Sequence, residues 1–158
     1  MKPKKTTLRL LCLMLLLLIG ASGLHAQVDY LCFTADEAGH VKLSVTGSIT
    51  ADIQTSTDGI NWTAYTFGTD INLAAGDSVF FKGNYHGSID NYARFVMSGK
   101  IRASGNIMTL TDGDNPTLSL AGKDFCFYRL FYNCEALISA PELPATTQAK
   151  GCYFDMFN

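Results

Sequence analysis

The chain is 158 residues long, 47% hydrophobic and 16% charged, with a formal net charge of −2 at pH 7. This length allows one domain with a small appendage, and the mildly acidic balance makes nucleic acids and anionic membranes poor partners. Proteins and neutral glycans remain as partner classes.

The first 26 residues have the three parts of a secretory signal peptide. They are a positively charged start over residues 1–9, an apolar core over 10–19 and a cleavage site at 24–26. The apolar core is about half of the roughly 20 residues that a membrane span needs. We therefore expect the protein to be exported to the cell surface or the extracellular space, and not to be an integral membrane protein after cleavage. Cleavage removes four of the 12 basic residues and none of the 14 acidic ones, which leaves a formal net charge of −6.

From residue 30 to about 117 the sequence predicts short strands separated by turns. Residues 41–45 alternate apolar and polar, as a half-buried strand does. Asp58-Gly59 lies between extended segments and predicts a type I′ hairpin, because both turn positions of that type need φ > 0.

Further strands are expected beside three more turn signals. They are residues 71–73 and 78–81 around a turn at 75–77, residues 95–97 and 100–103 as a hairpin around Ser98-Gly99, and residues 107–110 before Asp112-Gly113. Many short strands with regular turn signals are typical of an antiparallel β-sandwich, which we assign to residues 27–120.

The pattern changes after Gly122. Five apolar side chains fall at the spacing of one helix face, at positions i, i+3, i+4, i+7 and i+10 (Phe127, Leu130, Phe131, Cys134 and Leu137). Asp124 stands where it can cap this helix. Pro141 and Pro144 then exclude helix and favour an extended segment over 140–144. Helix, turn and short strand together make one unit of a solenoid.

The segment Cys126–Phe131 recurs 26 positions later as Cys152–Phe157. Each position keeps its chemical type except Arg129, which is replaced by Asp155. A period in the twenties is typical of leucine-rich repeats, whose units must stack on one another to bury their apolar faces. We therefore expect residues 121–158 to hold one complete repeat and one truncated repeat, as the start of an α/β solenoid.

The repeat segment resembles the BspA-like leucine-rich repeat, at Phe131, Cys134, Leu137, Leu143 and Pro144. The preceding β region is similar to the amino-terminal domain of some of these proteins, through Asp58-Gly59, Trp62 and residues 104–106. The resemblance implies a bacterial cell-surface or secreted interaction protein. It also implies a repeat core, made of Phe127, Leu130, Phe131, Cys134, Leu137 and Leu143.

Four cysteines follow the signal peptide, at positions 32, 126, 134 and 152. An even number in an exported protein permits disulfides. Because Cys126 and Cys152 hold the same place in two successive repeats, we favour buried, stacked thiols over bridges, and the pairing stays open.

Two sets of side chains are candidates for ligand binding. Trp62, Tyr65 and Tyr85 are planar aromatics that can stack on a sugar, although Trp62 just after a hairpin is favoured as a packing residue. Arg129, Tyr132 and Asp155 lie at variable positions of the repeats, where solenoids bind proteins.

Catalytic, metal and cofactor sites are not expected. Only His40 and His86 remain after the signal peptide, and the motifs of metalloproteases, serine hydrolases and P-loop proteins are absent from the sequence. Asp112-Gly113-Asp114-Asn115 offers oxygen ligands but is typical of a turn. We expect no enzyme.

Two functions follow. The first is an exported protein that binds host matrix proteins, host receptors or other microbes through its repeat surface. The second is a carbohydrate-binding sandwich that carries the repeats as a spacer. In either case so few repeats cannot stack on themselves, and we expect residues 123–158 to be poorly ordered or to lean on the β region.

Overall fold

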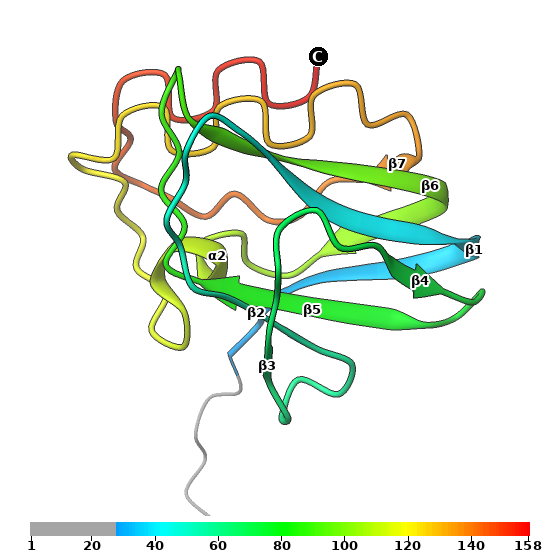
Figure 1. The fold of residues 1–158 in the computed structure, drawn as a ribbon. Helices are drawn as coiled ribbons and strands as arrows, with labels where there is room; N and C mark the ends of the chain where they lie inside the picture. Colours follow the sequence, from blue (N-terminus) through cyan, green and yellow to red (C-terminus); the bar gives the residue numbers. More distant parts are fainter. Residues whose placement is uncertain (1–27) are drawn as a thin grey trace, which may run out of the picture.

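The computed structural model describes residues 28–158, so the predicted signal peptide lies outside the described residues. Its elements, in chain order, are β1 (Leu31–Thr46), β2 (Ile53–Ser56), β3 (Thr63–Ala64), β4 (Ile71–Leu73), β5 (Ser78–Gly83), β6 (Tyr92–Ser104), α2 (Thr109–Asp112) and β7 (Leu137–Ser139). The strands form one open, mixed sheet in the order β3-β2-β5-β1-β6-β7, and β4 also pairs with β1 (Figure 1). The expectation of a mostly β chain is confirmed.

The long strand β1 is paired along both of its edges. One edge pairs with β6 over its whole length, from Cys32↔Ser104 to Thr46↔Tyr92. The other edge pairs with β5 over residues 31–34 and with β4 over residues 39–41, so the sheet forks at this edge. The strand predicted at residues 41–45 is confirmed within β1.

The predicted hairpin at Ser98-Gly99 is wrong, because residues 92–104 form the single strand β6. The ladder between β1 and β6 is irregular in two places between residues 35 and 40 of β1. Gly99 has a φ of 81°, and a Cβ on Gly39 would collide with the carbonyl oxygen of Ser98. The two glycines therefore allow a bulge in the pairing of β1 with β6 instead of a hairpin turn. The two strands stay paired on both sides of this bulge.

The hairpin predicted at Asp58-Gly59 is confirmed, because β2 and β3 pair on either side of it. The predicted turn type is wrong, since only Gly59 of the two residues has a positive φ. Asp58 instead caps the loop with its carboxylate, which accepts hydrogen bonds from the N–H groups of Ile60 and Asn61 and from the hydroxyl of Ser56. An aspartate that binds the backbone just after it in this way is an Asx-turn.

The predicted strand over residues 107–110 is also wrong, because the chain turns there into the short helix α2. Ile107, Met108 and Leu110 are all fully buried. A short apolar run that is buried on every side has no periodicity to distinguish strand from helix. The backbone N–H of Met108 binds the side chain of Asn106, which starts the turn.

The predicted helix over residues 127–137 is wrong, and the segment runs as a series of tight turns. In residues 124–134, here called the first ribbon, every second N–H donates to the carbonyl three residues back. Phe125, Arg129 and Asn133, at every fourth position, have a left-handed φ between 52° and 55°. Such residues cannot continue a right-handed helix. Asp124 does not cap a helix either, and its carboxylate accepts the N–H of Lys150.

Residues 150–158, here called the second ribbon, stack on the first. The N–H groups of residues 125, 127, 129, 131 and 133 donate to the carbonyls of residues 150, 152, 154, 156 and 158, at 2.7–3.2 Å. Three pairs of aromatic rings lie nearly parallel across the two ribbons (Phe127 on Tyr153, Tyr128 on Phe154, and Phe131 on Phe157). The 26-residue similarity in the sequence is therefore a physical stacking of the two copies (Figure 1).

The second ribbon has an edge without a backbone partner. The N–H groups of Cys152, Phe154 and Met156 donate to the carbonyls three residues back, whereas four others bond to no carbonyl within residues 28–158 (Gly151, Tyr153, Asp155 and Phe157). Since the carbonyls of residues 150, 152, 154, 156 and 158 are turned toward the first ribbon, this edge presents hydrogen-bond donors.

The ribbons share one hydrophobic core with the sheet. Phe131 stacks on Phe95 of β6 with the ring centroids 5.4 Å apart, and the N–H of Phe95 donates to the carbonyl of Leu130 at 2.8 Å. Tyr85 stacks on Phe127 in the same way. The expectation that residues 123–158 lean on the β region is confirmed.

The residues predicted as repeat core are mostly buried. Phe127, Leu130 and Phe131 are at most 2% exposed, and Cys134 and Leu137 are partly buried against the same core. Leu143 was assigned wrongly, because it is 40% exposed while Pro141 is buried.

Candidate functional site

Six side chains from three layers of the molecule meet at the ribbons. They are Tyr92 at the start of β6, Tyr128, Arg129 and Tyr132 of the first ribbon, and Phe154 and Asp155 of the second, here called the Arg129 patch. The structure thus brings together Arg129, Tyr132 and Asp155, three of the predicted site residues.

Arg129 is at the centre of this patch. Its guanidinium carbon lies 4.9 Å from the ring centroid of Tyr128 and 4.7 Å from that of Tyr132, and its Nη2 is 3.3 Å from a carboxylate oxygen of Asp155. Because Arg129 and Asp155 both have a left-handed φ at the same place in their ribbons, their side chains leave the backbone alike. The ion pair was not predicted from the sequence. The signal for it was that Arg129 is replaced by the oppositely charged Asp155 at the same position of the second copy.

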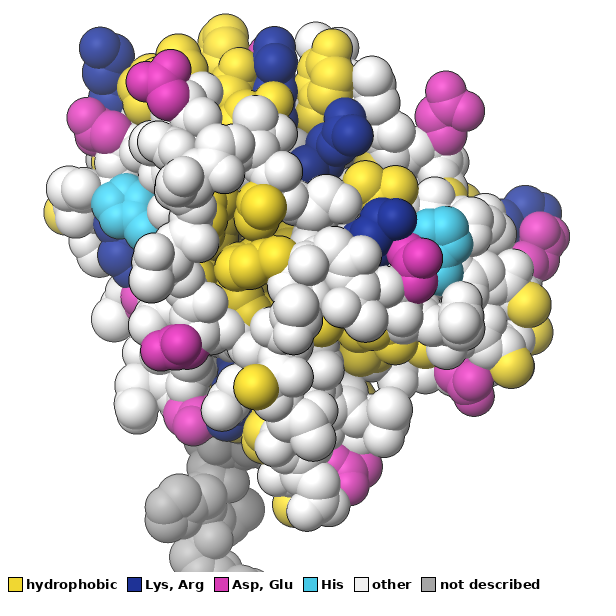
Figure 2. Space-filling model, in the orientation of Figure 1, with side chains coloured by type: hydrophobic (Ala, Val, Ile, Leu, Met, Phe, Trp, Pro, Cys, Tyr) yellow, Lys and Arg dark blue, Asp and Glu magenta, His cyan; other side chains and the backbone are white. Residues whose placement is uncertain are grey.

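An aromatic column crosses the patch beside the ion pair. Tyr128 meets Tyr92 edge-on, with the ring centroids 5.0 Å apart, and lies parallel to Phe154 at 6.0 Å. Tyr128 is 6% exposed, whereas Phe154 is 55% exposed. Hydrogen bonds from Thr46 and then Arg129 lower the pKa of Tyr92. Hydrophobic and charged side chains mix at the top of the molecule, over the ribbons (Figure 2).

The aromatic residues predicted to form a sugar platform do not lie together. Tyr85 is wrong as a ligand residue, because it is 1% exposed and its hydroxyl accepts the N–H of Ala93. Burial raises the pKa of Tyr85 well above its usual range. The half-buried Tyr65 anchors a loop, since its hydroxyl donates to the carbonyl of Thr69 and accepts the N–H of Leu43.

Trp62 belongs to a different group of side chains, here called the Trp62 cluster. The amine of Lys82 lies 4.3 Å from the ring centroid of Trp62 and 2.7 Å from a carboxylate oxygen of Asp114. Tyr30 meets Trp62 edge-on and donates its hydroxyl to the same oxygen at 2.7 Å. The hydrogen bonds from Lys82 and Tyr30 lower the pKa of Asp114, and burial, followed by the bond to Asp114, raises that of Tyr30 to about 12.

Ser98, His40 and Asp70 form an array that resembles a hydrolase triad in composition. Ser98 Oγ is 2.7 Å from His40 Nδ1, but the carboxylate of Asp70 is 3.8 Å from His40 Nε2 and has a nearer partner, the amine of Lys42 at 3.0 Å. Ser98 Oγ also accepts the backbone N–H of His40. These bonds hold β1 and β6 together at the bulge, and the distance to Asp70 is too long to orient the imidazole for catalysis.

Neither a family model, nor a curated protein, nor a solved structure matches this chain. Among the described residues, no helix has the length and apolar character to cross a membrane.

The four described cysteines are free, and three of them are buried. Burial raises the pKa of Cys126 to about 12 and that of Cys134 to about 11, so both stay protonated at neutral pH. A reactive thiol requires a lowered pKa. The preference for packed thiols over bridges agrees with Cys126 and Cys152 in the core.

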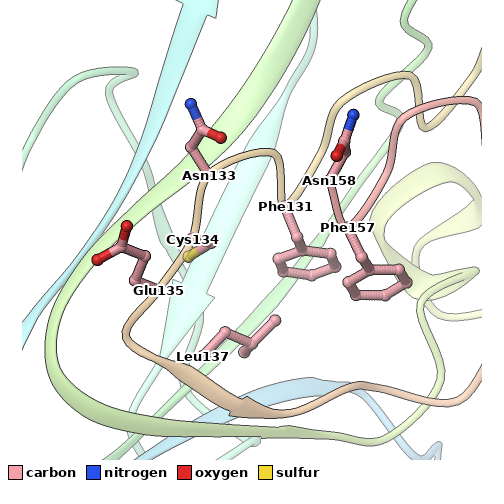
Figure 3. A pocket seen from close by; sticks show the side chains of 7 residues that line it. All are labelled: Phe131, Asn133, Cys134, Glu135, Leu137, Phe157 and Asn158. Atoms are coloured by element: carbon pink, nitrogen blue, oxygen red, sulfur yellow. The ribbon is translucent and has the colours of Figure 1, made fainter.

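A hollow of about 360 Å³ lies at one end of the two ribbons (Figure 3). The rings of Phe131 and Phe157 lie side by side along it, with Leu137 below and Cys134 beside them, while Glu135 points away from the rings. Its lining is mainly apolar side chains and amides, a combination for packing rather than for proton transfer. Among residues 28–158, no group of His, Cys, Asp and Glu is arranged to hold a metal ion.

Proposed function

We propose that this chain belongs to an exported, BspA-like surface or secreted protein that binds other proteins through the outer face of its stacked ribbons. In this proposal the forked sheet is a β-sandwich and the ribbons are the first units of a leucine-rich-repeat array. The stacking of two segments at a 26-residue offset supports the repeat assignment. The signal-peptide pattern of residues 1–26 supports export.

The Arg129 patch is the observation that carries the binding role. Tyrosine and arginine are enriched in the small groups of residues that dominate protein interfaces. Here an arginine is held by two tyrosine rings and a carboxylate, so little side-chain entropy is left to lose when a partner binds. Phe154 at 55% exposure offers the apolar area that a partner would cover.

The test is binding of residues 27–158 to a panel of purified extracellular-matrix proteins, receptor ectodomains and whole microbial cells. For any partner that binds, Phe154→Ala and Arg129→Ala should each weaken the affinity by about thirtyfold. Arg102→Ala and Ile60→Ala are matched controls, because Arg102 is also paired with a single carboxylate and Ile60 is 78% exposed. Circular dichroism checks that every variant is folded.

Two results would overturn the proposal. One is the absence of binding above background across the whole panel for the wild-type protein. The other is a partner whose affinity changes as much with the control variants as with the two patch variants, because binding would then not depend on the Arg129 patch.

A further inference from the structure

A second hollow, of about 230 Å³, lies at the far end of β5 beside the Trp62 cluster. Its walls come from three parts of the chain: the start of β2, the end of β5 and the loop after α2. Apart from two glycines, the lining residues carry polar or charged side chains (Asp52, Gln54, Lys82, Gly83, Asn84, Gly113 and Asp114). This composition differs from the apolar lining that small-molecule pockets usually have.

Lys82 is the most constrained of these residues. Only 11% of its side chain is exposed, and its amine lies 5.6 Å from the ring centroid of Tyr30 and 4.3 Å from that of Trp62 while it binds Asp114. An ammonium group has three N–H donors, and one of them is directed to Asp114. Lys82 is also one of the residues that line the hollow, so a cation whose side chain is already held by its neighbours lies at this site.

The other side chains supply donors and acceptors side by side. Asn84 uses its carbonyl oxygen to accept the N–H of Asp52 at 2.7 Å, and this bond leaves the amide N–H groups of Asn84 for a ligand. Asp114 uses one carboxylate oxygen for both Tyr30 and Lys82. Asp52, Gln54 and the second oxygen of Asp114 add acceptors to the same walls.

Charge and size restrict what can bind. Two carboxylates outweigh one ammonium in the lining, so a phosphate, a sulfate or an acidic sugar is disfavoured. A sugar hydroxyl both donates and accepts a hydrogen bond, as this mixed lining requires. The volume of the hollow is below the roughly 300–1,000 Å³ of pockets for drug-sized ligands, which indicates a ligand of the size of one sugar ring.

We propose that this hollow binds one neutral sugar unit of a glycan, with Lys82, Asn84 and Asp114 as its main hydrogen-bonding groups. Trp62 and Tyr30 are positioning residues that hold Lys82, and they need not touch the sugar. The proposal is independent of the protein-binding role, because the Trp62 cluster and the Arg129 patch share no residue.

The test is a titration of residues 27–158, labelled with ¹⁵N, with glucose, galactose, mannose and N-acetylglucosamine. At least one sugar should shift the amide signals of Gly83 and Gly113 saturably, in the millimolar range. Gln54→Ala should weaken the affinity for that sugar about three- to tenfold, since it removes one polar group from the wall of the hollow without changing a residue of the Trp62 cluster. The matched control is Gln148→Ala, which changes an exposed glutamine elsewhere and should bind as the wild type does.

A second variant tests the role of the cation. Lys82→Met keeps most of the apolar stem of the side chain and removes the ammonium. It should abolish the sugar-induced shifts of Gly83 and Gly113, while the amide signals away from the hollow stay as in the wild type and show that the variant is folded. Saturable shifts at Gly83 and Gly113 that Gln54→Ala leaves unaffected would overturn the proposal. So would the absence of shifts with all four sugars, or tighter binding of inorganic phosphate. Phe154→Ala should leave sugar binding unchanged, so the two roles can fail separately.

Discussion

Phe131 and Phe157 occupy the same place in the two ribbons but have different surroundings. Phe131 is 2% exposed and lies between two parallel rings, with centroids 5.4 Å away at Phe95 and 5.3 Å away at Phe157. Phe157 has the ring of Phe131 on one face and is 48% exposed. The same residue type thus contributes different amounts to stability in successive units.

We expect Phe131→Ala to lower the free energy of unfolding by about 3–5 kcal/mol, the usual cost of removing a buried phenyl ring. Phe157→Ala is the matched control and should cost about 1 kcal/mol, because about half of its surface is already in water. Urea unfolding followed by circular dichroism measures both. Equal losses for the two variants would contradict the packing described here.

Asp58 gives the hairpin between β2 and β3 a dependence on pH. Hydrogen bonds from the backbone and side chain of Asn61, and then from Ile60 and Ser56, hold the pKa of Asp58 well below its usual range. The folded chain therefore binds this proton more weakly than the unfolded chain, whose aspartates have a pKa of about 3.9. The stabilising contribution is complete above that pH and is lost as the pH falls further.

The variant Asp58→Asn should lose less stability than the wild type between about pH 5 and pH 2.5, because it cannot take up this proton. Urea midpoints across that range measure the difference. Asp90→Asn, in another exposed loop, is the control and should follow the wild-type profile. A profile for Asp58→Asn that also matches the wild type would show that the Asx-turn is not the source of the pH dependence.

The candidate residues could be predicted individually but not as groups. Arg129, Tyr132 and Asp155 were predicted from their places in the repeats, and they do meet. Tyr92 was missed because it comes from the first residue of β6, and no local pattern links a strand end to a ribbon. Tyr85 was misassigned for the same reason, since its burial depends on Phe127 stacking on it.

At the level of elements, the ribbons resemble a helix in the sequence for a physical reason. Their left-handed residues recur every fourth position, so side chains at i and i+4, such as Phe127 and Phe131, point to the same side. An α-helix gives nearly the same spacing. Hydrophobic periodicity therefore could not distinguish the two, although the 26-residue recurrence correctly indicated that the segments stack.

Gly151 is the residue that we expect to be most sensitive in the second ribbon. It has a φ of 60°, and a Cβ on it would collide with the ring of Phe125 in the first ribbon. Gly122 also has a positive φ, of 74°, but a Cβ there would have no atom within 4 Å. The two glycines therefore separate the cost of the backbone conformation from the cost of the contact.

We expect Gly122→Ala to lower the free energy of unfolding by about 1–2 kcal/mol, as the left-handed conformation requires. Gly151→Ala should cost about 1–3 kcal/mol more, because the ring of Phe125 must move. Thermal and urea unfolding of both variants give the comparison. Equal costs would mean that the ribbons separate easily.

At the level of the whole molecule, sheet and ribbons are not independently packed. Buried residues from β1, β5, β6 and both ribbons form one cluster, and Phe33 of β1 meets the ring of Phe131 with centroids 6.2 Å apart. The sequence indicated a change of pattern after Gly122. It could not show that the core continues across that point, because such contacts join residues about 100 positions apart.

This continuity predicts a distinct pattern of amide exchange. Every N–H from residue 125 to residue 134 has a backbone partner and should be protected about as well as β1 and β6. In the second ribbon, protection should alternate, with rapid exchange at Gly151, Tyr153, Asp155 and Phe157 and slower exchange at the residues between them. Exchange resolved by NMR tests this, and uniform rapid exchange from 123 to 158 would contradict it.

The unpaired edge of the second ribbon carries N–H donors only, which restricts what can pair with it. Two ordinary strand edges can join in either orientation because each carries donors and acceptors, and proteins must guard such edges against aggregation. Two copies of this edge would place N–H against N–H and repel one another. Only a segment that offers a row of carbonyls can pair with this edge. A further segment can therefore add to the stack with its carbonyls facing the second ribbon, but two copies of this edge cannot pair with each other. The backbone itself therefore protects this edge from self-association.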